Sequence, residues 1–224
     1  MSDEFAGRRV VVFGAGGALG QGVAEAFAQA GASVTGVDRH VPPADRQLEG
    51  VEYLTADVTQ DGDVAAVFAG RQAPWAVVNT VGGYAPHRAL TELDAAELSG
   101  QLNLNLVSAA LITKHGLAAL QAAGEGRIVH TASRAAVVTK GNGFAYSVSK
   151  LGVLHLVSMA ADDVRGSKIT VNCVVPSIID TPANRAALPN SDHSAWPKIP
   201  DIARSYLYLA SPGAALVNGA AIPV

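Results

Sequence analysis

Short apolar runs rich in Val and Ile alternate along this chain with longer stretches that have the period of an amphipathic helix. Strands of a parallel sheet are buried on both faces and read as such apolar runs, and the helices between them cover the two faces. The predicted strands are 9–14, 33–38, 52–57, 76–81, 127–132, 169–175 and 220–224, and the predicted helices are 21–30, 61–69, 95–122, 146–164 and 202–210. The sequence therefore predicts an α/β fold with a doubly wound parallel sheet of seven strands, in one domain over residues 1–224.

The stretch 181–200 breaks this alternation. It contains several prolines, many polar residues and Trp196, and it is long for a connection between two elements. Connections of that length are usually functional or mobile. We therefore expect a substrate loop at about 181–200 that closes when a ligand binds.

The composition argues against several classes of protein. The net charge is −3 and the basic residues are scattered, so no basic stripe is present to neutralise a nucleic-acid backbone. The single cysteine, Cys173, cannot form an intrachain disulfide, which favours a reducing, cytoplasmic location. No apolar run approaches the length of about 18 residues that a membrane span needs. The His residues show no metal-ligand spacing, so no metal site is predicted.

The first predicted strand runs into a glycine-rich turn and a helix, in the sequence VVVFGAGGALGQGVAEAF. Glycines in such a turn let the backbone approach a pyrophosphate, to which the helix N-terminus offers unpaired N–H groups and a partial positive charge. The dinucleotide-binding residues predicted here are Gly14, Gly17, Ala18, Leu19 and Gly20. The alternative is an ordinary tight turn between a strand and a helix.

Asp38 ends the second predicted strand and indicates which dinucleotide binds. A carboxylate at that place accepts hydrogen bonds from both adenosine ribose hydroxyls and repels a 2′-phosphate, so NAD is favoured over NADP. Arg39 leaves NADP open, because its guanidinium is able to pair with that phosphate. Asp57, followed by Val58 after the third strand, is predicted either to accept from the adenine amino group or to cap a helix.

The segment FAYSVSK, at 144–150, places Tyr146 and Lys150 on one face of a predicted helix. A tyrosine has a pKa of about 10, and a neighbouring ammonium favours the phenolate and lowers that pKa. A phenol adjusted in this way gives a proton to a developing alkoxide, or takes one from an alcohol, near neutral pH. Taken alone, the pair is also what an ordinary helix surface shows.

Two further residues support the catalytic interpretation. Ser133 follows the fifth predicted strand, at the edge where open α/β sheets bind ligands, and its hydroxyl is expected to hold a carbonyl oxygen beside the phenol. Asn105 lies inside an apolar helix, where an amide is costly to bury without partners. The alternatives are turn chemistry for Ser133 and a structural hydrogen bond between helices for Asn105.

With the glycine turn, Asp38, NTVGG, Asn105, Ser133 and YSVSK in this order, the chain resembles the short-chain dehydrogenase/reductase family along almost its entire length. The resemblance implies a Rossmann-type domain, commonly in a homotetramer or homodimer, that acts as an NAD(P)-dependent oxidoreductase. Its reaction would be hydride transfer between nicotinamide and a carbonyl or alcohol substrate. The resemblance makes Tyr146 the catalytic acid/base and Lys150 the residue that lowers its pKa and binds the nicotinamide ribose.

The resemblance also implies roles for residues around this pair. Ser133 would orient the substrate oxygen, and Asn105 would hold a water that connects Lys150 to solvent. Asn79 would belong to the segment that supports the sheet and passes near the adenosine. The segment expected against the nicotinamide carboxamide contributes Pro176, Ile178 and Thr181.

The family pattern is not matched everywhere, and two other functions stay open. Thr80 and Val81 alter the family's Asn-Asn-Ala-Gly motif, and Ser177 replaces a usual Gly. GGALG, NTVGGYAP and DTPANRAALPNSDHSAW look like the dihydropteridine reductases, which implies an NADH-dependent pterin reductase as an alternative. That branch lacks the catalytic serine, so Ser133 favours carbonyl or alcohol chemistry. The other alternative is a catalytically idle nucleotide sensor, which would have no use for Tyr146.

The sequence indicates the class of substrate only through the residues that are expected to line its pocket. The pocket wall is expected from Tyr84, Pro86 and His87, from residues 134–138 and from residues 184–196. This lining is largely aromatic and apolar, so we expect a small and fairly hydrophobic substrate.

Overall fold

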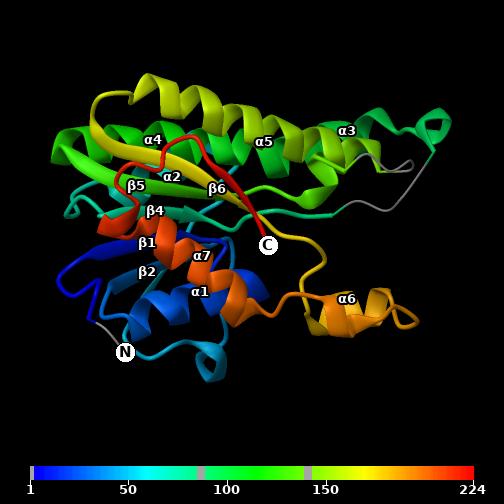
Figure 1. The fold of residues 1–224 in the computed structure, drawn as a ribbon, viewed down its shortest axis with the longest axis horizontal. Coiled ribbons are helices and arrows are strands. Elements are labelled where there is room, and N and C mark those ends of the chain that lie inside the picture. The colour runs from blue at the N-terminus through cyan, green and yellow to red at the C-terminus, as the bar shows by residue number, and fades with distance from the viewer. Residues whose placement is uncertain (1–2, 85–88, 139–142) are drawn as a thin grey trace.

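The computed structural model describes residues 3–84, 89–138 and 143–224. These residues form a seven-stranded sheet in the order β3-β2-β1-β4-β5-β6-β7 (Figure 1). Its strands are β1 (Arg9–Phe13), β2 (Ser33–Asp38), β3 (Val51–Thr55), β4 (Ala76–Asn79), β5 (Glu125–Thr131), β6 (Lys168–Val175) and β7 (Ala221–Pro223). Neighbouring strands are parallel throughout. The predicted doubly wound α/β sheet is confirmed.

Helices cover both faces of the sheet (Figure 1). One layer holds α2 (Asp61–Phe68), α4 (Ser108–Ala123) and α5 (Phe144–Asp163), and the other holds α1 (Ala18–Gln29) and α7 (Ile199–Ala210). In β1, Val11 and Phe13 face the first layer, whereas Val10 and Val12 face the second. The inner strands β1, β4, β5 and β6 are buried on both sides, and their sequences are accordingly rich in apolar residues, whereas the edge strands β3 and β7 keep exposed residues.

The strand order reverses beside β1. This strand pairs with β2 on one side and with β4 on the other, so the chain winds outward in two directions from that point. Open α/β sheets bind ligands in the crevice beyond the carboxyl ends of the strands at such a reversal. The predicted site residues Gly14, Asp38 and Asn79 lie at the carboxyl ends of β1, β2 and β4.

The long predicted helix at 95–122 is helical throughout, but one of its turns is π-helical. It divides into α3 (Ala95–Leu102), a π-helical turn at Asn103–Val107, and α4. A π turn adds a residue to one helical turn, which redirects the side chains around it, and such turns are frequent at functional sites. The apolar period runs on through the sequence NLNLV, so the pattern alone did not reveal the π turn.

The stretch 181–200 contains more regular structure than its composition indicated. It folds into α6 (Pro182–Ala187) and a 3₁₀ turn at His193–Ala195, and α7 begins at Ile199 instead of the expected residue 202. Thr181 caps α6, because its Oγ1 accepts from the Asn184 N–H at 3.1 Å, and Pro182 occupies the first helical position. Closure of this segment on a ligand stays a prediction.

Candidate active site

The glycine turn after β1 depends on close approaches of the backbone. Gly14 has a φ of +85°, a left-handed conformation that glycine adopts at little cost. A Cβ on Gly14 would come within 2.6 Å of the Thr80 Oγ1, and a Cβ on Gly20 would overlap the Gly14 carbonyl oxygen. The Thr80 hydroxyl donates to the Phe13 carbonyl at 2.8 Å. Thr80, which departs from the family motif, thus forms a hydrogen bond with the start of the glycine turn.

Helix α1 begins directly after this turn. Gly17 is its N-cap, and the Gly17 carbonyl accepts from the Gln21 N–H at 2.9 Å. The N–H groups of Ala18, Leu19 and Gly20 come before this first hydrogen bond of the helix. They therefore have no partner within the helix. They form the kind of helix N-terminus that binds phosphate.

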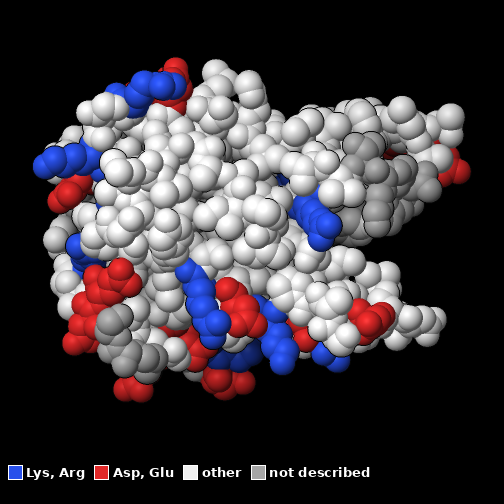
Figure 2. All heavy atoms as spheres, in the orientation of Figure 1, with Lys and Arg blue, Asp and Glu red and all other residues white. Residues whose placement is uncertain are grey.

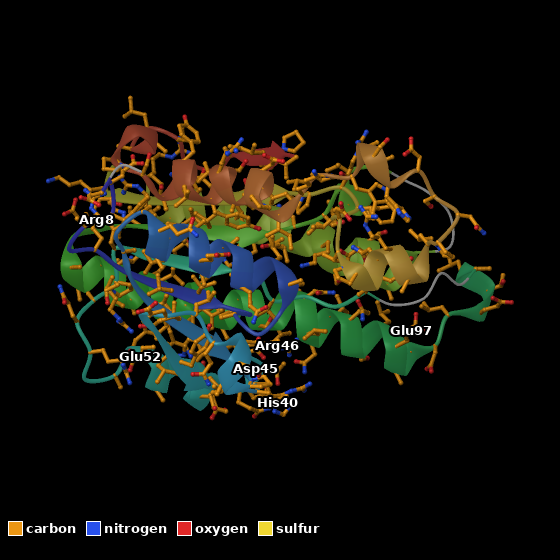
Figure 3. All side chains as sticks on the ribbon, turned by 90° about the horizontal axis from the view of Figure 1, so that it is seen from below. Arg8, His40, Asp45, Arg46, Glu52 and Glu97 are labelled. Carbon is orange, nitrogen blue, oxygen red and sulfur yellow. The ribbon has the colours of Figure 1, made fainter. Side chains whose placement is uncertain are left out.

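Asp38 faces the glycine turn from the end of β2. Its Oδ2 accepts from the Gly16 N–H at 2.9 Å, and its Oδ1 accepts from the His40 N–H at 3.4 Å. The carboxylate borders a pocket of about 370 Å³, whose other lining residues are Gly16, Gly17, His40, Val41, Pro42, Pro43 and Arg46. Figure 3 shows His40 and Arg46 together at this edge of the molecule.

Asp57 makes the contacts of a structural residue. Its Oδ1 accepts from the Thr59 N–H at 3.0 Å and from the Thr59 hydroxyl at 2.7 Å. These hydrogen bonds, and to a smaller extent the charge of the exposed Arg39, hold the pKa of Asp57 below its usual value. The neighbouring Val58 is buried in the core beside α2. The geometry favours the capping interpretation, and adenine contacts by Asp57 and Val58 stay predictions.

Lys150 is buried where α5 crosses the carboxyl ends of the strands. Its Nζ donates to the Thr131 carbonyl at 3.0 Å and to the Val81 carbonyl at 3.5 Å. Burial lowers the pKa of Lys150 to about 8, and the nearby Cys173 opposes that shift. A Cβ on Gly82 would come within 2.7 Å of the Nζ, so glycine at that position leaves room for the ammonium. Lys150 is therefore not a helix-surface residue.

Tyr146 lies in the first turn of α5, with Ser133 near enough to its hydroxyl to affect its pKa. Burial raises the pKa of the Tyr146 phenol, while Ser133 acts in the opposite direction. The net shift is opposite to the one expected, because loss of water disfavours the phenolate. Lowering of this pKa by Lys150 stays a prediction. Ser133 also forms the turn that was its alternative role, since its Oγ accepts from the Ala135 N–H at 3.2 Å.

Asn105 lies in the π-helical turn and is only 1% exposed. Its Oδ1 accepts from the Gly83 N–H at 3.0 Å, and its Nδ2 lies 3.1 Å from the Gly83 carbonyl, 3.0 Å from the Gln101 Oε1 and 2.9 Å from the Ser149 Oγ. Ser149 donates in turn to the Tyr146 carbonyl at 2.7 Å. The amide therefore joins the loop after β4 to the first turn of α5. The water that the resemblance implies at Asn105 stays a prediction.

Sequence reasoning missed a buried hydrogen-bond chain through His130. The Asn79 Nδ2 donates to the His130 Nδ1 at 3.1 Å, and the His130 Nε2 lies 2.9 Å from the Thr113 Oγ1. Thr113 donates its own proton to the Ala109 carbonyl, so the His130 Nε2 carries the hydrogen and the ring is neutral. Burial lowers the pKa of His130 to about 3, with a further contribution from the charge of Lys150.

A second missed contact reaches the site from α7. The hydroxyl of the fully buried Tyr206 lies 2.6 Å from the Thr131 Oγ1, and Thr131 donates to the Asn79 carbonyl at 2.7 Å. Thr131 is also the residue whose carbonyl binds Lys150. The polar residues of the apolar strand RIVHT were the available signal for both contacts, because such groups are buried only with partners.

The segment after β6 passes beside the Ser133 turn. The Pro176 carbonyl accepts from the Arg134 N–H at 2.9 Å. Ile178 is 45% exposed, and the Thr181 hydroxyl is engaged as the cap of α6. Contacts of Pro176, Ile178 and Thr181 with a nicotinamide stay predictions.

The expected substrate wall is only partly described. Pro86 and His87 lie outside the described residues, whereas the ring of Tyr84 packs against the ring of Tyr146. Figure 2 shows a notch at the right of the molecule, between the part that carries α3 and the part that carries α6 in Figure 1. Most of the described atoms at its visible rim belong to residues other than Lys, Arg, Asp and Glu, and a basic side chain lies at the inner edge. Among the described residues, no group of three His, Cys, Asp or Glu side chains is placed to hold a metal.

Comparisons with known proteins cover nearly the whole chain. The family model described as enoyl-(acyl carrier protein) reductase matches residues 14–224. A cis-4-hydroxycyclohexanecarboxylate dehydrogenase from Sinomonas cyclohexanicum is 32% identical, over 100% of this chain and 97% of the relative. A 3-oxoacyl-(acyl-carrier-protein) reductase from Pseudomonas aeruginosa is also 32% identical, over 97% and 96% of the two chains. The solved structure of a short-chain type dehydrogenase/reductase from Mycobacterium ulcerans has a TM-score of 0.90 at 27% identity, over 100% of this chain and 90% of that chain.

Proposed function

Because this chain belongs to the short-chain dehydrogenase/reductase family, and is thus an oxidoreductase that transfers a hydride with NAD(P), we propose that Tyr146 is its catalytic acid/base. The observation that carries the proposal is a convergence of side chains at one edge of the sheet. There Tyr146 lies near Ser133, Lys150 is buried on strand-end carbonyls, and Asn105 is bonded through Ser149 to the Tyr146 backbone.

The bound nicotinamide supplies or accepts the hydride. In the reducing direction the Ser133 hydroxyl donates a hydrogen bond to the substrate carbonyl oxygen, and Tyr146 gives its phenolic proton to that oxygen as negative charge develops. Lys150 provides a fixed positive charge that favours the phenolate left behind. In the oxidising direction the Tyr146 phenolate takes the proton of the substrate hydroxyl.

The residues at the strand reversal fit a dinucleotide. Gly14 and Gly20 leave no space for a Cβ, so the turn presents bare backbone at the start of α1. The N–H groups of Ala18, Leu19 and Gly20 would hold the pyrophosphate. The remaining proposed contacts are Asp38 with the adenosine ribose, Asp57, Val58 and Asn79 near the adenosine, Tyr146 and Lys150 with the nicotinamide ribose, and Pro176, Ile178 and Thr181 with the carboxamide.

NAD is the favoured cofactor. The Asp38 carboxylate borders the pocket at the end of β2 and would accept from the ribose hydroxyls while repelling a 2′-phosphate. Arg46 and His40 border the same pocket, and Arg39 is exposed beside it, so NADP is the alternative.

The proposed substrate is a small secondary alcohol or ketone with a largely apolar body. The exposed ring of Tyr84, which packs against Tyr146, supports this class. The relatives are consistent with it, since one is named for a hydroxyl group on a cyclohexane ring and another for a 3-oxo group. The position of Ser133 near the Tyr146 hydroxyl favours this chemistry over pterin reduction and over a nucleotide sensor that has no catalytic role.

We also propose a cytoplasmic homotetramer or homodimer. The outer side of α5 exposes Val148, Leu151 and Met159, which lie on one helical face. The apolar helical stretches Ala95–Ala123 and Phe144–Asp163 are only 33% and 39% buried over their most apolar windows. Exposed apolar residues gathered on one helical face are typical of an interface, and light scattering would test it by the mass in solution.

A turnover screen combined with one substitution tests the proposed reaction. NADH and NADPH oxidation would be followed with ketones, diketones, quinones and a quinonoid pterin, and the alcohols would be run in reverse. Tyr146→Phe should abolish turnover and leave NADH binding nearly intact, whereas the control Tyr208→Phe, on the exposed side of α7, should behave as the wild type. Wild-type protein that binds NADH but transfers no hydride to any of these compounds would support the sensor.

A further inference from the structure

Tyr84 packs directly against the proposed catalytic tyrosine. The ring centroids of Tyr84 and Tyr146 are 5.1 Å apart and the ring planes meet at 71°, an edge-to-face arrangement that aromatic pairs favour. The Tyr84 residue is 58% exposed, so much of its surface stays in contact with solvent. Its ring therefore contacts the phenol ring from the solvent side of the site.

Tyr146 needs partners outside its own helix. It is the third residue of α5, which begins at Phe144, and a first helical turn lacks the preceding turn against which interior side chains pack. Ser133 lies near the Tyr146 hydroxyl and affects its pKa, but a contact at the hydroxyl alone leaves the ring free to tilt. The Tyr84 ring supplies a second contact, and two contacts define the orientation of the ring.

The backbone that carries Tyr84 is itself fixed. The preceding residue, Gly83, is hydrogen-bonded at its N–H and at its carbonyl by the Asn105 amide. A Cβ on Gly83 would come within 2.6 Å of the Leu104 side chain, so this segment lies close against the π-helical turn. Asn105 therefore sets the starting point of the Tyr84 side chain and, through Ser149, the first turn of α5.

From these contacts we propose that Tyr84 is a positioning residue, whose ring holds the Tyr146 ring at the angle at which its hydroxyl meets Ser133 and the substrate oxygen. The inference rests on the proposed role of Tyr146 as acid/base. Reacting groups that move by about 1 Å lose up to roughly 100-fold in rate, so a tilted phenol lowers kcat even when the cofactor still binds. The ring also keeps water from the Tyr146 phenol, whose pKa burial raises.

The test compares Tyr84→Leu, which removes the aromatic ring, with Tyr84→Phe, which keeps it, and with Tyr208→Leu as a control on an exposed tyrosine of α7. Tyr84→Leu is expected to lower kcat about tenfold or more, with the KM for the nicotinamide cofactor within about twofold of the wild type. In Tyr84→Leu, the part of the pH profile of kcat that reflects ionisation of Tyr146 should move to lower pH. Water then reaches the phenol and stabilises the phenolate. Tyr84→Phe should restore both kcat and the pH profile.

Three results overturn the inference. Wild-type kcat in Tyr84→Leu shows that the ring does not position Tyr146, and an unchanged kcat with a raised KM for the carbonyl substrate shows a lining residue instead. A Tyr84→Phe protein as impaired as Tyr84→Leu shows that the hydroxyl acts and not the ring. Wild-type turnover by Tyr146→Phe is a separate result, since it removes the proposed function itself and would be seen without any change at Tyr84.

Discussion

The Asn105 Nδ2 lies 2.9 Å from the Ser149 Oγ, and this hydrogen bond links the π-helical turn to the helix that carries Tyr146. The same amide is bonded to both polar groups of the Gly83 backbone. One side chain thus holds together three segments that meet at the proposed active site.

Replacement of Asn105 by Ala should therefore damage both stability and activity. The buried Ser149 hydroxyl and the Gly83 backbone lose their partner, which is expected to cost about 1–3 kcal/mol in the free energy of unfolding. Turnover should fall by about tenfold or more, because the Asn105 amide no longer fixes the backbone segments that carry Tyr84 and Tyr146. The exposed Asn103, two residues earlier, provides the matched control as Asn103→Ala. Equal unfolding midpoints in urea and equal kcat for the two variants would contradict the linking role.

Lys150 makes the stability of the protein depend on pH above neutrality. Its pKa is about 8 in the folded protein against an ordinary 10.5, so between these values the unfolded chain binds a proton that the native protein does not. The free energy of unfolding of the wild type should therefore rise with pH across this window, by up to about 3 kcal/mol relative to Lys150→Met. Urea denaturation of both proteins from pH 7.5 to 10 measures the difference. Parallel curves would show that the lysine keeps an ordinary pKa in the fold.

His130 should also make the free energy of unfolding rise with pH, in this case in the acid range. Its pKa of about 3 lies below the ordinary 6.5, so its contribution to stability is complete above pH 6.5 and is lost as the pH falls toward 3. At pH 5 the wild type should have lost about 2 kcal/mol of unfolding free energy to this group. His130→Asn removes the titrating ring, and its stability should decline less between pH 7 and pH 5. A decline equal to that of the wild type would show that the ring already binds a proton in the native state.

Asp38→Asn separates the charge of Asp38 from its support of the glycine turn. The amide keeps an oxygen that accepts from the Gly16 N–H but no longer repels a phosphate. We expect NADH affinity to fall about tenfold and NADPH affinity to rise, since a hydrogen bond to a charged group contributes roughly 1.5–3 kcal/mol. The exposed Asp45, in the 3₁₀ turn that Figure 3 shows beside Arg46, serves as the control in Asp45→Asn. Fluorescence titration with both cofactors would give the ratio, and an unchanged ratio would contradict the assignment of NAD specificity to Asp38.

Much of the fold could be predicted because its causes are local. Apolar runs such as RVVVF and KITVNCVV indicate buried parallel strands wherever they fall in the chain, and all seven strands were located to within a few residues. Helix starts were less accurate, since α1 begins at Ala18 and α5 at Phe144, where caps and turns decide the boundary more than period does. The π-helical turn was not predicted, because it depends on the partners that the Asn105 amide finds in other segments.

By itself, the sequence determined the alternation of strands and helices, the glycine turn, and which chemical groups stand at the ends of the strands, since these follow from residue types and spacing. Only the tertiary structure decided the environment of those groups. Lys150 meets carbonyls 19 and 69 residues away in the chain, and the Tyr146 ring packs against the ring of Tyr84, 62 positions earlier. Burial and hydrogen-bond partners are properties of such distant neighbours, and they reversed the expected direction of the Tyr146 pKa, because the loss of water around a phenol appears only when the segments pack together.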